Sequence, residues 1–147
     1  MEKDNRQTKD EKYMRMALAE AHAAQEAGEI PVGAVVVCGD LSLIHISETL
    51  HDVTAHAEMQ AITAAADSLG GKYLKDCTLY VTVEPCTMCA GALGWSQVSR
   101  VVYGAPDDKR GYTQYAPSAL HTRTTVTTGV LEDECRRLMQ DFFKDKR

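Results

Sequence analysis

Hydrophobic and polar positions along the chain follow a pattern that predicts strands separated by helices. Short apolar runs rich in β-branched residues are typical of buried strands, whereas apolar residues three or four positions apart are typical of one helix face. Strands are predicted at residues 32–38, 41–47, 78–83, 98–103 and 124–127. Helices are predicted at residues 8–28, 55–69, 86–95 and 131–142. This alternation predicts an α/β sandwich with a largely buried sheet.

Local signals mark where several of these helices begin. Thr8 and Glu11 have the spacing of a capping box at the start of the first helix. Thr54 is placed to cap the second helix, and Pro85 suits the first position of the third. Residues 104–122 are mostly polar and predict a long loop.

Length and composition are those of an ordinary globular domain. The chain has 147 residues, of which 44% are hydrophobic and 25% are charged, and this predicts one domain spanning residues 1–147. No apolar run approaches the roughly 20 residues that a membrane-spanning helix needs. The polar start does not resemble a signal peptide. We therefore expect a cytoplasmic protein without a membrane partner.

The charge of the chain is unevenly distributed. The net charge of −5 argues against a protein that coats nucleic acid nonspecifically. Residues 1–99 hold 7 basic and 14 acidic side chains, whereas residues 100–147 hold 9 basic and 7 acidic ones. The basic groups of the second part could contact the phosphates of an anionic partner, or the tail could simply be a solvated helix end. Six basic residues are the candidates for such phosphate contacts: Lys109, Arg110, Arg136, Lys144, Lys146 and Arg147.

Cysteine usage points to metal or redox chemistry at one place. An odd number of cysteines, five, in a chain of this length argues against a disulfide framework. Cys38 lies in an apolar strand and Cys135 on an apolar helix face, so both are expected to be inert core residues. The short spacing between Cys86 and Cys89 singles out this pair.

The strongest chemical signal combines that pair with a histidine. Cys86 and Cys89 are three positions apart, so on a helix they share one face and can bind one ion. His56 would supply a nitrogen ligand from the start of the preceding helix. Three protein ligands leave a tetrahedral zinc with one open position, which is typical of a catalytic site.

Glu58 lies two residues after the histidine and would face the same cavity without binding the metal. Zinc lowers the pKa of its bound water to about 7, so a nucleophile is available at neutral pH. A nearby carboxylate can take the proton of that water and deliver it to a leaving amine. Glu58 is therefore the expected catalytic residue.

Two other interpretations of these residues stay open. A Cys-x-x-Cys pair could be a thioredoxin-like redox centre, although that does not explain the His-x-Glu sequence. The three ligands could instead belong to a structural zinc site with Cys77 or His51 as the fourth ligand.

The motifs resemble those of a known family. His-x-Glu followed by Pro-Cys-x-x-Cys is the signature of zinc deaminases. The segments GEIPVGA (28–34), TAHAE (54–58), EPCTMCAGA (84–92) and GVL (129–131) resemble the bacterial tRNA-specific adenosine deaminases over nearly the whole chain. The resemblance implies a cytidine deaminase-like fold: a three-layer α/β/α sandwich around a mixed sheet of about five strands.

The same resemblance implies an activity and a set of site residues. It implies hydrolysis of adenosine to inosine at the wobble position of a tRNA anticodon, by a homodimer with one zinc ion per chain. His56, Cys86 and Cys89 would bind zinc, and Glu58 would move protons. The residues implied to contact the substrate are Ile30, Pro31, Val32, His45, Ala57 and Asp107.

Two positions depart from the family pattern and bear on substrate recognition. His45 occupies the apparent position of the family's asparagine, which hydrogen-bonds the target nucleoside, in a segment that looks a few residues short. A shortened strand could shift register and turn its side chains to the other face. Pro106 stands where the family commonly has a basic residue.

Two alternatives to the tRNA substrate are kept. One is a deaminase of a free base or nucleoside, of the guanine or cytosine type, which shares the metal centre. The other is a catalytically impaired relative that binds RNA without turnover.

Overall fold

The computed structural model describes residues 2–38, 41–47, 56–71 and 73–145. The strands are β1 (Gly33–Cys38), β2 (Leu41–Ser47), β3 (Cys77–Val83), β4 (Arg100–Ala105) and β5 (Thr125–Thr128). The helices are α1 (Glu2–Glu26), α2 (Ala57–Leu69), α3 (Thr87–Ser96), α4 (Tyr112–Tyr115) and α5 (Glu132–Asp145). None of the helices in this part of the chain is long and apolar enough to cross a membrane.

All five strands form one mixed sheet in the order β2-β1-β3-β4-β5. β1 runs antiparallel to both β2 and β3, whereas β3, β4 and β5 are parallel to one another. Parallel neighbours require a crossover, which α3 provides between β3 and β4. The predicted five-stranded mixed sheet is confirmed.

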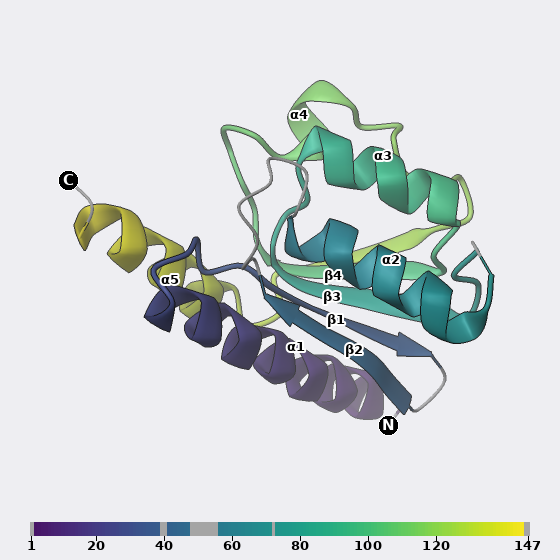
Figure 1. The fold of residues 1–147 in the computed structure, drawn as a ribbon, viewed down its shortest axis with the longest axis horizontal. Helices are drawn as coiled ribbons and strands as arrows, with labels where there is room; N and C mark the ends of the chain where they lie inside the picture. Colours follow the sequence, from purple (N-terminus) through teal and green to yellow (C-terminus); the bar gives the residue numbers. More distant parts are fainter. Residues whose placement is uncertain (1, 39–40, 48–55, 72, 146–147) are drawn as a thin grey trace.

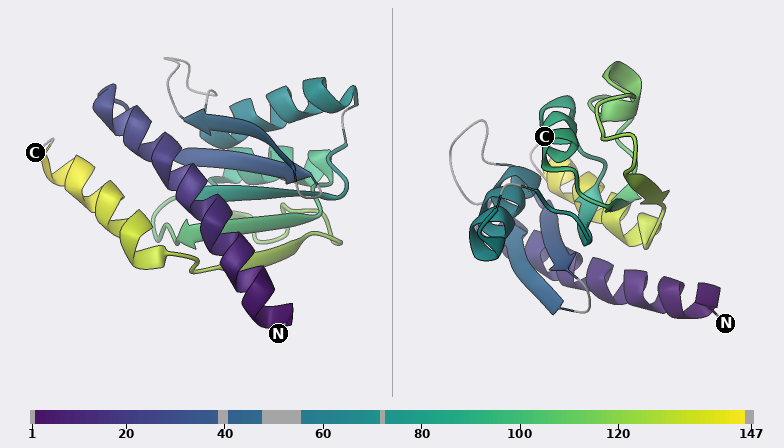
Figure 2. Two further views of the ribbon diagram at one scale, coloured as in Figure 1. Left: turned by 90° about the horizontal axis from the view of Figure 1, so that it is seen from below. Right: turned by 90° about the vertical axis from the view of Figure 1, so that its right-hand side faces the viewer.

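Helices cover both faces of the sheet. α2 and α3 lie on one face, and α1 and α5 lie on the other (Figures 1 and 2). Successive residues of β1 contribute to opposite sides: Ala34 and Val36 belong to the core beneath α2 and α3, and Val35 and Val37 to the core beneath α1 and α5. Burial on both faces explains why this strand is apolar throughout. The three-layer α/β/α prediction is confirmed.

Several element boundaries differ from the predicted ones. α1 begins at Glu2, so Thr8 lies inside the helix. Cys86 is the N-cap of α3, so Pro85 precedes the helix instead of opening it. β4 runs on to Ala105 and a short helix, α4, interrupts the predicted long loop. Thr54, the predicted cap of α2, lies outside the described residues.

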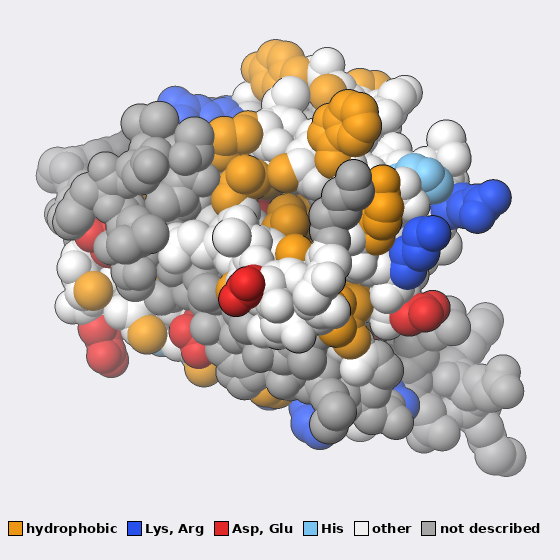
Figure 3. Space-filling view, turned by 45° about the vertical axis from the view of Figure 1, so that its right-hand side comes forward, with side chains coloured by type: hydrophobic (Ala, Val, Ile, Leu, Met, Phe, Trp, Pro, Cys, Tyr) orange, Lys and Arg blue, Asp and Glu red, His pale blue; other side chains and the backbone are white. Residues whose placement is uncertain are grey.

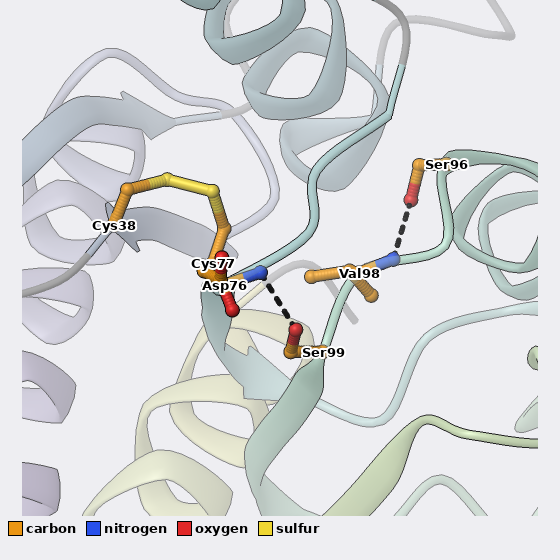
Figure 4. The surroundings of a disulfide bond; sticks show 6 residues. All are labelled: Cys38, Asp76, Cys77, Ser96, Val98 and Ser99. Carbon is orange, nitrogen blue, oxygen red and sulfur yellow. Dashed lines mark hydrogen bonds between the residues drawn. A yellow bond between two sulfur atoms is a disulfide. The ribbon is translucent and has the colours of Figure 1, made fainter.

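Cys38 and Cys77 form a disulfide, which corrects two predictions (Figure 4). The antiparallel register of β1 and β3 sets them directly opposite, with their Cα atoms 4.2 Å apart. Cys38 is therefore not an inert core residue, and cysteines that are 39 positions apart in the sequence are paired. Cys77 is also excluded as a fourth zinc ligand. The remaining cysteines are free.

A buried ion pair fastens α1 to the sheet. The two terminal guanidinium nitrogens of Arg100, Nη1 and Nη2, on β4, donate to the Asp10 carboxylate of α1, at 2.7 and 2.6 Å. The Tyr80 hydroxyl, from β3, donates to the same carboxylate at 2.8 Å. Only 6% of the Asp10 side chain and 17% of the Arg100 side chain are exposed. The Asp10 carboxylate therefore joins α1 to both β3 and β4. Because it is buried, water screens its charge little.

We expect the Asp10→Ala substitution to lower the free energy of unfolding by about 3–5 kcal/mol, because it leaves the Arg100 charge buried without its partner. Glu134→Ala is the matched control. It breaks the Arg15–Glu134 ion pair, whose side chains are 59% and 44% exposed, and should cost less than about 1 kcal/mol. Urea denaturation measures both values. Equal losses in the two variants would contradict the assigned role of the buried pair.

Candidate functional site

The three predicted zinc ligands meet above the carboxyl end of β3. His56 is the N-cap of α2, and Cys86 is the N-cap of α3; both have extended backbone angles. Cys89 lies one turn further along α3. The two helices lie next to each other on the same face of the sheet (Figure 1). The unpaired N–H groups and the dipole of each helix start favour a nearby thiolate.

The distances between the ligand atoms suit a tetrahedral metal ion. The Nδ1 atom of His56 is 3.5 Å from the sulfur of Cys86 and 3.5 Å from the sulfur of Cys89. All three atoms lie within 4.8 Å of one another. Zinc bonds of about 2.3 Å to sulfur and 2.0–2.1 Å to nitrogen give a tetrahedral N–S edge of about 3.6 Å. One nitrogen and two sulfur donors therefore fit zinc in both kind and spacing.

The pKa values of the two thiols are shifted in opposite directions. A hydrogen bond from the Cys89 thiol, aided by the nearby His56 and opposed by burial, lowers the pKa of Cys86 to about 5. The same hydrogen bond, together with burial and the nearby Glu58 carboxylate, raises the pKa of Cys89. Cys86 is therefore a thiolate at neutral pH, which is the form that binds metal.

Glu58 lies in the first turn of α2 and is buried. Burial disfavours its charged form and raises the pKa of its carboxyl to about 7. Opposing contributions come from a backbone hydrogen bond and from His56 and Cys89. A carboxyl group with this pKa can both accept and donate a proton at neutral pH.

The residues expected to line the substrate site lie just before β1 and at the start of α2. Pro31 and Val32 are buried, Ile30 is half-buried, and Ala57 is fully buried at the start of α2. The Gly33 N–H, directly after this segment, donates to the Thr82 hydroxyl of β3 at 3.2 Å. This bond holds the apolar segment against the strand that carries the cysteine turn.

The structure describes only the backbone at His45, which pairs with Val35 of β1. The register of β1 and β2 shifts between Val36 and Val37, whose partners are Ile44 and Ser42. β2 therefore contains one extra residue, Leu43, at an irregularity of the bulge type. The predicted hairpin strand is present, with this irregularity two residues before His45.

The predicted RNA-contacting residues lie in two separate places. Lys109 and Arg110 are exposed between β4 and α4, and their backbone N–H groups both donate to the Asp107 carboxylate at 3.0 Å. Lys144 is exposed near the end of α5. Arg136 pairs with Glu132 on the same helix. Lys146 and Arg147 lie outside the described residues, as does His51, the other suggested fourth ligand.

Two residues of the site were missed by the sequence analysis. Glu84 is buried immediately before the cysteine motif, and Thr113 donates to its carboxylate through both the backbone N–H and the hydroxyl. Its position in the sequence, as a charged residue between an apolar strand and Pro85, could have identified Glu84. Its partner lies 29 positions away, so no local pattern identified it.

Comparisons with known proteins agree with the geometry. Residues 7–105 match the model of the cytidine and deoxycytidylate deaminase zinc-binding region. The chain is 43% identical to the tRNA-specific adenosine deaminase of Bacillus subtilis, over 95% of this chain and 92% of that protein.

Two solved structures extend the similarity. One comes from a study of A-to-I editing by tRNA deaminases at the wobble position of transfer RNA; its TM-score is 0.79 and its identity 38%, over 86% of this chain and 97% of that one. The other is a guanine deaminase from Nitrosomonas europaea, with a TM-score of 0.74 and 28% identity, over 90% of this chain and 83% of that one.

We expect protein purified without chelator to hold about one zinc ion per chain, because the three ligands form a single group. Cys86→Ala should lose most of this zinc. Cys135→Ala should keep it, because Cys135 packs on the opposite face of the sheet. Elemental analysis measures the content. Undiminished zinc in the Cys86 variant would contradict the ligand assignment.

Proposed function

The chain belongs to the zinc-dependent deaminase family of cytidine and deoxycytidylate deaminases, and we propose that it deaminates adenosine to inosine at the wobble position of a tRNA anticodon. One observation carries the proposal: a His-Cys-Cys group lies beside a buried glutamate, in a chain that shares 43% identity with a tRNA-specific adenosine deaminase over nearly its whole length.

The proposed reaction adds water at C6 of adenine, breaks the bond from C6 to the exocyclic nitrogen, and releases ammonia. Zinc held by His56, Cys86 and Cys89 would supply Lewis acidity, which makes water nucleophilic at neutral pH. Glu58 accepts the proton of the water and returns it to the leaving nitrogen. A pKa of about 7 suits this carboxyl for both transfers.

An anticodon loop is a suitable substrate for a half-buried centre. Its bases are already unstacked, so one of them can enter a pocket without the few kcal/mol that opening a duplex costs. Pro31, Val32 and Ala57 are apolar and buried, and we expect the purine ring to pack against this segment. Action on tRNA also implies a cytoplasmic location.

The proposal includes a homodimer. Trp95 on α3 is 85% exposed and Tyr115 on α4 is 69% exposed. Trp95 borders a groove of about 380 Å³ that Ala119 and His121 also line. Hydrophobic side chains gather on the upper part of the face seen in Figure 3. Large exposed aromatic residues beside a groove are typical of interaction surfaces.

The activity is tested by incubating the zinc-loaded protein with unmodified tRNA, digesting the RNA and measuring inosine. We expect inosine from tRNA, and Glu58→Ala should keep zinc and fold but lose at least about 10²-fold in rate, because general acid–base catalysis contributes 10²- to 10⁴-fold. A variant that retains a tenth of the rate, a difference of roughly 1.4 kcal/mol in barrier, would remove Glu58 from this role.

The same assay separates the alternatives. Deamination of free guanine, cytosine or nucleosides without inosine in tRNA would favour a free-base or nucleoside deaminase. Binding of tRNA without any product would favour a catalytically impaired RNA-binding relative.

The basic residues are tested through the salt dependence of tRNA binding. If about four of them contact phosphates, log affinity should fall with log salt at a slope near −3, since each contact to single-stranded RNA contributes about −0.7. Replacing Lys109 and Arg110 by alanine should flatten the slope by about 1.4. Arg15→Ala, on α1, should leave it unchanged. If the slope does not change when Lys109 and Arg110 are replaced, these residues do not contact the RNA and the loop is only solvated.

The dimer is tested by sedimentation of the zinc-loaded protein. We expect a dimer that Trp95→Glu dissociates, because the substitution would bury a charge at the proposed contact. Phe143→Glu alters another exposed aromatic residue, on α5, and should leave the dimer intact. A monomeric wild-type protein would overturn this part of the proposal.

A further inference from the structure

Glu84 is a buried carboxylate that the proposed chemistry does not use. It follows β3 directly, is 5% exposed, and has no ion-pair partner among the described residues. Its Oε1 atom accepts a hydrogen bond from the Asp107 N–H at 3.1 Å. Its Oε2 atom accepts from the Thr113 N–H at 3.1 Å and from the Thr113 hydroxyl at 2.7 Å. A buried charge is costly unless it is hydrogen-bonded, and here residues 107–113 supply the donors.

Residues 107–113 close tightly around this carboxylate, and we refer to them as the Glu84 loop. A Cβ atom at Gly111 would lie 2.2 Å from Oε2 of Glu84 and 2.6 Å from the Asp107 carbonyl oxygen. Only glycine fits there without displacing one of them. The Gly111 N–H also donates to the Asp107 carbonyl at 3.0 Å. The loop is therefore built around Glu84.

The Glu84 loop is joined to the turn that carries the metal ligands. Gly111 forms an antiparallel β-bridge with Cys86, and the Tyr112 N–H donates to the Pro85 carbonyl at 3.0 Å. The bridge and the hydrogen bond therefore fix the position of the loop relative to Cys86.

The loop carries two exposed cations. Lys109 and Arg110 have exposed side chains, while their backbone N–H groups are held by the Asp107 carboxylate. Asp107 in turn donates its own N–H to Glu84. A continuous series of hydrogen bonds therefore runs from the buried carboxylate to the backbone of the two basic residues.

We propose that Glu84 is a positioning residue for the RNA substrate: its buried carboxylate fixes the Glu84 loop against the cysteine turn and so sets where Lys109 and Arg110 meet the RNA backbone relative to the zinc ligands. This inference rests on the proposed function for the identity of the substrate. The anchoring of the loop is independent of it and is measured separately.

The anchoring is tested by hydrogen exchange. Glu84→Gln keeps one carbonyl acceptor but points an amide group at donors, so one N–H of Asp107 or Thr113 loses its partner. We expect faster exchange of the amides of residues 107–113, with unchanged protection of β3 and β4 and unchanged zinc content. Unaltered exchange in the loop would overturn the anchoring.

A milder variant guards against misfolding. Thr113→Val removes only the hydroxyl that donates to Glu84. Its matched control is Thr124→Val, which removes a partly buried hydroxyl bonded to the Val98 carbonyl at 2.7 Å, at the opposite end of β4. Faster loop exchange in the first variant and not in the second supports the anchoring; the reverse overturns it.

The effect on RNA is tested by steady-state kinetics with an anticodon stem-loop. A buried donor without a partner shifts the equilibrium of the loop by a factor of roughly 5 to 150, and RNA binding must restore the loop against that shift. Glu84→Gln should therefore raise KM about 10-fold, with a smaller change in kcat. The decisive measurement combines it with Lys109→Ala and Arg110→Ala. These two substitutions should weaken binding in the wild type and in Thr124→Val, but add little in Glu84→Gln, where the cations are already displaced.

The outcomes are distinguishable from failure of the proposed function. A wild-type protein that forms no inosine in tRNA overturns the substrate and with it the RNA part of this inference, while hydrogen exchange still decides the anchoring. Active protein in which the Glu84 and cation substitutions act additively overturns the positioning role and leaves the proposed function standing. Loss of zinc in Glu84→Gln with unchanged affinity for the anticodon stem-loop also overturns it.

Discussion

The parallel pairing of β3 with β4 brings the cysteine turn and the Glu84 loop to one edge of the sheet. Val83 lies in register with Ala105, so both strands end at the same edge of the sheet. The cysteine turn follows one strand and the Glu84 loop follows the other. Open α/β sheets place their ligand sites at such carboxyl edges because loops and helix starts converge there. α2 brings His56 and Glu58 to the same edge.

Glu84 and Glu58 are both buried at this edge, but their surroundings suit them to different roles. The oxygens of Glu84 are occupied by donors from residues 107–113, which commits this carboxylate to holding a loop. Glu58 lies beside His56 and Cys89, two of the proposed zinc ligands, and burial raises the pKa of its carboxyl to about 7, which suits it to the proposed proton transfer. Burial alone therefore does not define a catalytic acid, because the donors around the carboxylate decide what it does.

Much of the fold followed from the sequence because its signals are local. Apolar runs located the strands, cap, stop and proline signals located α2 and α3, and helical spacing located α5. Gly70 ends α2 in a left-handed conformation. Helix boundaries were predicted less accurately than the helices themselves. Pro85 suits a helix start, but the extended backbone of Cys86 makes that residue the cap.

The layered α/β architecture and the candidate zinc ligands could be predicted from the sequence, because strand and helix periods and the spacing of Cys86 and Cys89 are short-range properties. The folded chain was needed to see that Cys38 pairs with Cys77, that Asp10 binds Arg100, and that Glu84 accepts hydrogen bonds from residues 107–113. Each of these contacts joins positions more than 20 residues apart. Such contacts arise from strand register and layer packing, which no local pattern of residues encodes.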